Sequence, residues 1–89
     1  MEGTHNIELI ERKQIKISGV KKIDSFDDLE FLIDTTMGYL YIKGKELEII
    51  KLDTNSGNIT INGVIDSINY VDSKNKKESS FIGKLFKWY

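Results

Sequence analysis

The stretch FLIDTTMGYLYIK, residues 31–43, contains two runs of alternating side chains separated by the pair Met37-Gly38. A period of two is typical of β-strands, because successive side chains of an extended chain point to opposite sides. Glycine readily adopts the positive φ that tight hairpin turns require. The stretch therefore predicts a β-hairpin with these alternating residues: Phe31, Ile33 and Thr35, then Tyr39 and Tyr41 against Leu40 and Ile42.

The same pattern continues on both sides of this hairpin. The chain has no proline, so glycine is the best guide to strand boundaries. We predict an all-β domain over residues 6–71, a meander of about seven or eight short antiparallel strands that forms a small sandwich or barrel. The X-Gly pairs that divide it are Ser18-Gly19, Met37-Gly38, Lys43-Gly44, Ser56-Gly57 and Asn62-Gly63.

Two segments of this region depart from simple alternation. In an extended chain, Leu47 and Ile49 occupy one side while Ile50 and Leu52 occupy the other. We expect this strand to be covered on both sides, at the centre of the fold or at a subunit contact. Residues 25–30 begin like a capped helical turn but are too few for a structural helix, so we predict a β-turn or bulge there.

Composition allows one globular domain. Small domains of this size, 89 residues, bury a modest core, and 39% hydrophobic with 30% charged residues suits a folded protein. A net charge of −1 gives no overall attraction to nucleic acid, so we expect no nucleic-acid partner. No apolar run reaches the ~18–20 residues that span a bilayer, and no signal peptide is recognisable. With no cysteine, a cytoplasmic location is expected.

A sheet of this size also predicts self-association. A single open sheet would leave its apolar face in water. An exposed edge strand can pair with a second chain. We therefore expect a homo-oligomer.

The C-terminal region divides into a linker and an amphipathic segment. Residues 72–80, DSKNKKESS, contain no large apolar side chain and predict a polar linker. In residues 81–89, FIGKLFKWY, the apolar side chains fall within roughly 160° of a helical projection, which predicts a short amphipathic helix. The docking residues expected in it are Phe81, Ile82, Lys84, Leu85, Phe86, Lys87, Trp88 and Tyr89.

So short a helix is unstable alone and should form only when docked. Three docking surfaces remain open at this stage. They are the β-domain itself or a sister subunit, the groove of a partner protein, and a membrane interface, where Trp, Phe and Lys are common anchors.

No group of residues has the spacing of a catalytic or metal site. His5 is the sole histidine, and we expect it in a frayed N-terminus without a metal or general-base role. Residues 53–58 begin like a calcium loop, but Asn58 stands where an EF-hand needs glycine, so a β-turn is predicted. The acidic residues of 24–30 predict a solvated turn. We therefore expect no enzyme, no cofactor and no metal.

Three tyrosines suggest a second function. Tyr39, Tyr41 and Tyr70 could form a shared interface, and aromatic rings stack on sugars or bases. Acidic and basic residues are balanced around Tyr39 and Tyr41, which does not favour nucleic acid. The alternative to an assembly protein is therefore a glycan- or ligand-binding β-module that uses these surface tyrosines.

Several motifs resemble the YabP/YqfC family of sporulation proteins. Residues 17–27, ISGVKKIDSFD, are similar to the family pattern I-x-G-V…V-x-S-F-D. Residues 31–47 are similar to F-L-L-x-T-x-M-G-x-L-x-I-x-G-x-x-L, and residues 61–70 to I-x-G-x-I-x-x-L-x-Y. Residues 83–87, GKLFK, match the ending of the YabP branch. The resemblance extends in register over nearly the whole chain.

This resemblance implies a role in endospore formation, in assembly of the spore cortex or envelope. It further implies synthesis in the mother cell and a membrane protein partner, YabQ, because the family is usually encoded beside it. With residues 81–89 as the attachment, we expect a peripheral position at the outer forespore membrane. The resemblance provides no catalytic residue. The function expected is a non-enzymatic assembly or adaptor protein that self-associates and binds a membrane partner.

Overall fold

Six antiparallel β-strands form one continuous sheet in the computed structural model, which describes residues 4–71. The strand order is β1-β2-β6-β5-β4-β3. The all-β prediction is confirmed for these residues. The strands are β1 (Ile7–Ile10), β2 (Gln14–Ile17), β3 (Val20–Phe26), β4 (Glu30–Thr35), β5 (Gly38–Asp53) and β6 (Asn58–Val71).

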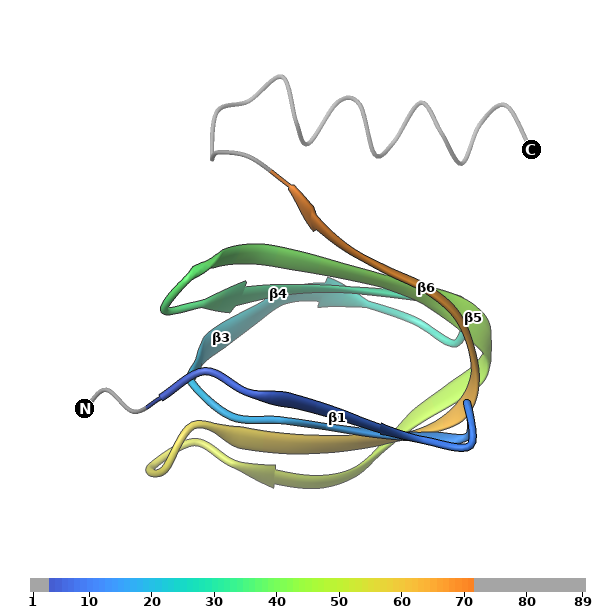
Figure 1. Cartoon of the computed structure of the whole chain (residues 1–89), viewed down its shortest axis with the longest axis horizontal. Helices are drawn as coiled ribbons and strands as arrows, with labels where there is room; N and C mark the ends of the chain where they lie inside the picture. Colours follow the sequence, from blue (N-terminus) through green and yellow to red (C-terminus); the bar gives the residue numbers. More distant parts are fainter. Residues whose placement is uncertain (1–3, 72–89) are drawn as a thin grey trace.

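The length of β5 and β6 turns this single sheet into two layers. These strands contain 16 and 14 residues, and each curves from one layer into the other (Figure 1). What we call the β4 layer contains β3, β4, residues 38–43 of β5 and residues 64–71 of β6. The β2 layer contains β1, β2, residues 48–53 of β5 and residues 58–62 of β6. The architecture is a sandwich whose layers share two strands.

Glycines permit the two bends. A Cβ atom on Gly44 would overlap the carbonyl oxygen of Val64, so only glycine lets β5 and β6 approach this closely. Gly63 has a φ of +138°, and a Cβ there would lie 2.7 Å from the carbonyl oxygen of Glu46. The β5–β6 pairing is irregular here, with register shifts between Lys43 and Glu48. Such bulges increase strand twist and allow a sheet to turn a corner.

The predicted count of seven or eight strands is not confirmed, because the described residues form six. The difference arises at Lys43-Gly44 and Asn62-Gly63, where the sequence predicts turns and the structure has bends inside continuous strands. In contrast, Gly19 and Gly57 lie outside the strands with positive φ, and Gly38 begins β5 immediately after a turn. X-Gly pairs therefore mark changes of direction, of which only some end a strand.

Two turns brace the bends from opposite sides. In the β3–β4 turn, the carbonyl oxygens of Leu29 and Asp28 accept hydrogen bonds from the amides of Gly44 and Leu47, both at 2.9 Å. The carbonyl oxygens of the β1–β2 turn accept from Gly63 and Ile65 at 3.0 and 2.9 Å. Backbone groups that the irregular ladder would leave unpaired are satisfied in this way.

The core lies between the layers and is built from alternating residues of every strand except β1 and β3. Full burial of one such side chain contributes about 1.5–3 kcal/mol, so this cluster provides most of the stability. Its predominance of isoleucine suits strands, because β-branched side chains pack well on a pleated surface. Its members are Ile15, Ile17, Phe31, Ile33, Leu40, Ile42, Leu47, Ile59, Ile61 and Ile65.

β3 follows an apolar period of three instead of two. Register shifts between Val20 and Lys22 and between Ile23 and Ser25 each insert an extra residue. The shifts keep Val20, Ile23 and Phe26 on the core side, opposite Thr35, Ile33 and Phe31 of β4. This edge strand thus presents an apolar row along one side of the molecule.

The expectation for residues 46–52 is wrong in part. This half of β5 pairs with β6 on one side, and no strand of residues 4–71 pairs with its other side, so it is an edge and not a central strand. A bulge between Ile49 and Lys51 returns Leu52 to the core side, opposite Ile59. Ile50 and Leu52 remain 50% and 46% exposed. A subunit contact at this edge stays a prediction.

The bends predict different costs for two glycine substitutions. Gly44→Ala should lower the free energy of unfolding by about 3 kcal/mol or more, because its Cβ requires β5 and β6 to separate. Gly38→Ala is the matched control, since its φ is +118° but nothing lies within 4 Å of the added Cβ. It should cost about 1–2 kcal/mol from backbone strain alone. Urea unfolding measures both, and equal costs would contradict the close approach at Gly44.

Candidate interaction surfaces

The outer face of the β4 layer is apolar at its centre. Leu32 of β4 stands opposite Tyr41 of β5, and Tyr39 stands opposite Val71 of β6. These positions alternate with the core residues and therefore point away from the core. We call these four residues the outer tyrosine face. Tyr41 is only 7% exposed, whereas the others are half-buried.

Charged side chains surround this face. Glu30 stands opposite Lys43 and Asp34 opposite Tyr39 in the β4–β5 register, and the Tyr41 hydroxyl lies 3.5 Å from Glu30 Oε1. Burial raises the pKa of the Glu30 carboxyl above its ordinary value, and the nearby Asp27 carboxylate raises it further. The Tyr41 hydroxyl and Lys43 oppose this pKa shift without cancelling it. The Glu30 carboxylate is therefore partly desolvated at the rim of the apolar face.

Tyr70 belongs to a different surface. It stands opposite the core residue Leu40, so its side chain lies on the core side of the sheet and emerges at the open margin of β6, 54% exposed. The structure therefore brings together Tyr39 and Tyr41 but not Tyr70. The three tyrosines therefore do not form one stacking platform. The alternation within each strand does not reveal this, because it does not say which face of β6 matches which face of β5.

His5 holds the N-terminal segment in place. Its Nδ1 donates to the carbonyl oxygen of Ser18 at 2.8 Å, and its Nε2 forms a 2.6 Å hydrogen bond with the Tyr70 hydroxyl. The imidazole also packs edge-on against the Tyr70 ring. The expectation of a frayed His5 is wrong, because a partner 65 positions away in the sequence orders it. The contact joins the N-terminal segment to the end of β6.

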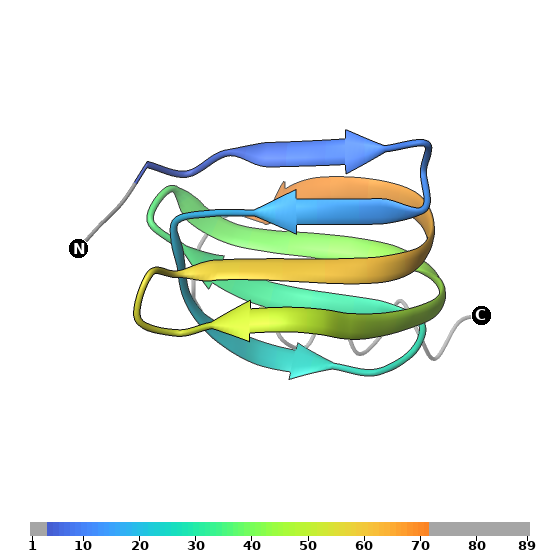
Figure 2. The same ribbon diagram turned by 90° about the horizontal axis from the view of Figure 1, so that it is seen from below.

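A groove lies between β3 and the second half of β5. In Figure 2 the end of β5 runs beside β3 along one margin of the molecule. The groove is about 190 Å³ and is lined by Val20, Ile23, Leu52 and the adjoining β5–β6 turn, with Lys21 and Lys22 at its side. One hydrogen bond, from the Val20 amide to the Gly57 carbonyl oxygen at 3.0 Å, connects the two margins. We call this the β3–β5 groove.

Sequence reasoning missed the β3–β5 groove because it searched for a period of two. The relevant signal is the apolar spacing of three at Val20, Ile23 and Phe26, which only bulges place on one face. Phe26 continues the row beyond the groove and stacks on Phe31 with 5.2 Å between ring centroids, yet it is 56% exposed. Leu29, in the following turn, is 52% exposed.

The outer face of the β2 layer contains a larger and more polar hollow. Its volume is about 520 Å³, and its charged lining residues are Glu8, Lys16, Lys51 and Asp53. Both signs of charge alternate across it, so it selects neither anions nor cations. Lys16 and Lys51 are exposed, in contrast to the half-buried outward positions of β4. The two outer faces of the sandwich thus differ in polarity.

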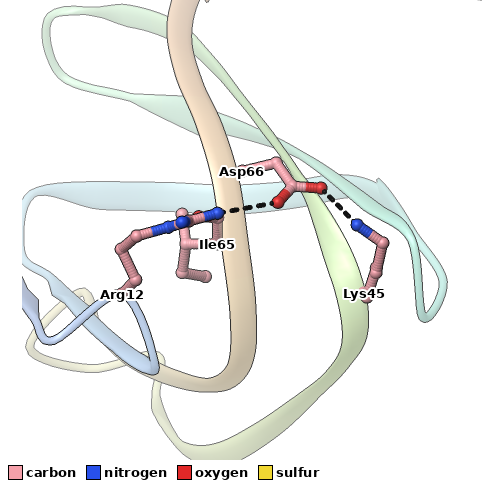
Figure 3. A network of polar contacts seen from close by, with 4 residues as sticks. All are labelled: Arg12, Lys45, Ile65 and Asp66. Carbon is pink, nitrogen blue, oxygen red and sulfur yellow. Dashed lines mark hydrogen bonds and ion pairs between the residues drawn. The ribbon is translucent and has the colours of Figure 1, made fainter.

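Asp66 connects three elements next to the bends (Figure 3). Its Oδ1 accepts from the Arg12 guanidinium at 3.0 Å, and its Oδ2 accepts from Lys45 Nζ at 3.2 Å. Arg12 Nε also donates to the carbonyl oxygen of Ile65 at 3.0 Å. With Arg12 and Lys45 side chains 65% exposed, each ion pair contributes at most about 1 kcal/mol. The network orients the β1–β2 turn and offers no reactive group.

The acidic segments form turns, as predicted. Asp27 Oδ1 accepts from the amides of Leu29 and Glu30 at 2.8 and 3.0 Å. Asp53 Oδ1 accepts from the amides of Asn55 and Ser56. Hydrogen bonding to the Ser56 side chain, and then to these amides, lowers the pKa of the Asp53 carboxyl. Within residues 4–71, no three His, Asp or Glu side chains gather as metal ligands. The same residues contain no helix that is long and apolar enough to cross a membrane.

The predicted docking segment, residues 81–89, and the polar linker, residues 72–80, lie outside the described residues. The C-terminal helix therefore stays a prediction. What the structure does establish is where the preceding chain ends: Val71 closes β6 opposite Tyr39, on the outer tyrosine face.

Comparison of the sequence with known proteins shows the family of this chain. The sequence matches the YabP family over residues 1–77, most of the chain. The chain belongs to the YabP family. It is 39% identical over 84 residues to the spore protein YabP of Bacillus subtilis strain 168, covering 93% of this chain and 84% of that protein. The resemblance seen in the motifs is thereby confirmed.

The raised pKa of Glu30 predicts that replacing this residue by glutamine stabilises the fold in a pH-dependent way. Its raised pKa means that the folded chain holds the Glu30 proton more tightly, so unfolding free energy falls as pH rises from the ordinary value of 4.5 through the folded pKa. Glu30→Gln cannot ionise and should raise the thermal midpoint at pH 7. The gain should vanish well below pH 4.5, where Glu30 is protonated in both states.

The matched control for Glu30 is Glu8→Gln on the exposed face of β1. As a surface substitution without a buried partner, it should change the midpoint little at either pH. Calorimetric scans of the three proteins at both pH values make the comparison. A lower midpoint for Glu30→Gln at pH 7 would show that the Tyr41 and Lys43 contacts outweigh desolvation.

Proposed function

We propose that this member of the YabP family is a non-enzymatic assembly protein of endospore formation. It self-associates through the β3–β5 groove and attaches to a membrane partner through residues 81–89. Membership of the family, and 39% identity to a protein named a spore protein, support the role in sporulation. The apolar groove between two strand margins is the observation that carries the self-association.

The β3–β5 groove favours a second copy of this chain as its occupant. Val20, Ile23 and Phe26 are evenly spaced along one side of β3, so a two-fold axis through Ile23 places Phe26 opposite the Val20 of the second copy. The same axis places Lys22 opposite Asp24 of the second copy; these residues already pair at 3.7 Å within one chain, so the contact brings no like charges together. The bulges and lysines of β3 disfavour repeated edge-to-edge pairing of strands from many chains. A closed dimer is therefore favoured over a filament.

The polar residues of the described region support binding more than chemistry. His5 is engaged by the Ser18 carbonyl oxygen and by Tyr70, and the acidic cluster is used in the β3–β4 turn. The Asp66 carboxylate is neutralised by Arg12 and Lys45. These groups position backbone segments, which is the task of a scaffold.

Attachment to a membrane partner rests on the amphipathic pattern of residues 81–89. Their apolar arc carries Trp88 and Phe86, while Lys84 and Lys87 lie on the other side. The polar linker of residues 72–80 lets this segment reach away from the sheet. We propose a position at the outer forespore membrane of the mother cell, with a membrane protein, for which the resemblance indicates YabQ, as the partner.

Self-association predicts a charge-sensitive dimer. The full chain should have twice the monomer mass of 10.2 kDa in solution, measured by sedimentation equilibrium. Leu52→Lys adds a third positive charge beside Lys21 and Lys22 in the β3–β5 groove and should shift the mass to that of the monomer. The fold should persist, because Leu52 is already 46% exposed.

The matched control is Met37→Lys, which alters a 70% exposed residue in the β4–β5 turn and should leave the dimer intact. A chain ending at Val71 should also remain dimeric. A monomeric parent chain, or dissociation by both lysine variants alike, would remove the β3–β5 groove as the contact.

Attachment predicts a loss of localisation when the tail is removed. In sporulating cells, a fluorescent fusion of the full chain should outline the forespore, and a fusion ending at Val71 should be diffuse. Circular dichroism of the purified short chain checks that the sheet remains folded. An unchanged outline would exclude the tail as the attachment.

Two lysine variants separate a lipid from a protein surface. If anionic lipid is contacted directly, Lys84→Gln and Lys87→Gln should each weaken vesicle binding by about 1 kcal/mol, roughly fivefold. Lys16→Gln, on the outer face of the β2 layer, is the control and should have no effect. Forespore localisation that survives both tail substitutions would assign the contact to the membrane protein.

A further inference from the structure

The outer tyrosine face is apolar where a water-exposed face should be polar. An antiparallel sheet with one face on the core normally alternates apolar and polar residues along each strand. The β2 layer follows this rule, with Lys16 and Lys51 exposed on its outer face. The β4 layer does not, because Leu32, Tyr39 and Tyr41 face outward. The centre of its outer face therefore has the composition of a layer covered on both sides, with Glu30, Asp34 and Lys43 at the rim.

The low solvent exposure of these residues also indicates that the outer tyrosine face is covered. Tyr41 is 7% exposed, and the outward residues of β4, including charged Glu30 and Asp34, are all half-buried. The strands of residues 4–71 form one sheet whose other face encloses the core, so none of them covers this face. Whatever covers it must come from outside residues 4–71.

We propose that residues 81–89 dock on the outer tyrosine face of their own chain. This segment has an apolar arc of roughly 160° on a helical projection, which needs an apolar surface to become stable. It offers five large apolar or aromatic residues besides Ile82, and the face offers two tyrosines, a leucine and a valine. Both surfaces are amphipathic and rich in aromatic rings, which pack favourably on one another.

The path of the chain brings residues 81–89 of the same molecule close to this face. The linker starts directly after Val71, which is itself part of the outer tyrosine face. Nine linker residues reach at most about 30 Å when extended, while the molecule measures 34 × 28 × 16 Å. A helix of nine residues is about 14 Å long. The segment can therefore return across the face within the reach of its linker.

Tethering also favours the chain's own segment over another molecule. A short flexible linker holds its end at an effective concentration of millimolar order. A second copy would have to reach that concentration in solution to compete. An intramolecular contact is therefore favoured at ordinary protein concentrations.

Docking has a consequence for attachment that rests on the function proposed above. The apolar arc of residues 81–89 cannot face the sheet and a membrane partner together. A membrane partner must therefore compete with the outer tyrosine face for the segment. Attachment becomes conditional on a partner that binds the segment more tightly than the sheet does.

Trp88 is the only tryptophan, so its fluorescence reports on the segment directly. In the full chain without membranes, Trp88 emission should be blue-shifted and protected from acrylamide. Leu32→Asn, on the outer tyrosine face, should shift the emission toward that of a water-exposed indole. Ile50→Asn, an apolar-to-Asn change on the outer face of the other layer, is the control and should leave the spectrum unchanged.

A distance measurement keeps the test independent of the stability of these variants. The chain has no cysteine, so Asn69→Cys places one nitroxide label on the outer face of the β4 layer, beside Tyr41. That label should quench Trp88, whereas a label at Thr60→Cys on the β2 layer should not. Quenching should be unchanged by dilution, because the contact lies within one chain.

Three outcomes would overturn the proposal. They are a water-exposed Trp88 in the parent chain, equal quenching from both labels, and quenching that disappears on dilution, which would assign the contact to a second copy. None of these measurements involves a membrane or the groove variants. Failure here would therefore leave the dimer and the attachment to be judged by their own experiments.

Discussion

The close approach of β5 and β6 at Gly44 and Gly63 is the constraint on which this fold depends. Both strands must change layer at the same place, and a side chain on Gly44 would collide with the Val64 carbonyl oxygen. Because the bends are coincident, core residues before and after them meet across the interior, and Leu47 fills the corner. The two flanking turns then satisfy the backbone groups of the bend.

Folding one sheet over itself leaves two places where strand edges of the two layers are not paired with each other. His5 bridges the N-terminal segment to Tyr70 at the end of β6. At the other margin, between β3 and β5, a single bond from Val20 to Gly57 leaves an apolar groove. The groove is the direct result of a two-layer sandwich that shares strands and does not close into a barrel. The self-association that we propose uses this groove and needs no dedicated binding loop.

The features that could be predicted from the sequence are those that depend only on neighbouring residues, namely strand alternation and turns. Alternation correctly separated Tyr39 and Tyr41 from Leu40, which the structure places on opposite faces, because the side-chain period of a strand is local. It also predicted turns at the acidic segments, whose Asp side chains bond to amides two and three positions ahead. Local chemistry of this kind needs no knowledge of the rest of the chain.

Features set by distant segments were not predictable in this way. A glycine that bends a strand and one that ends a strand have the same local sequence, so Gly44 and Gly63 were read as turns. The β3 bulges depend on the register with β4, and the order of His5 depends on Tyr70. The spacing of three along β3 indicates one wall of the β3–β5 groove, but the position of Leu52 opposite it depends on the fold of the whole sheet.

The docking that we propose on the β4 layer connects stability with attachment. A domain of this size buries a small core, so any additional apolar burial is a large fraction of its stability. When residues 81–89 cover the outer tyrosine face, they stabilise the layer that also carries β3 and one wall of the groove. If a membrane partner takes the segment away, that support of the layer is lost. Because the proposed dimer contact lies at the β3–β5 groove and not on the outer tyrosine face, we expect release of the segment to lower the stability of the layer without dissolving the dimer.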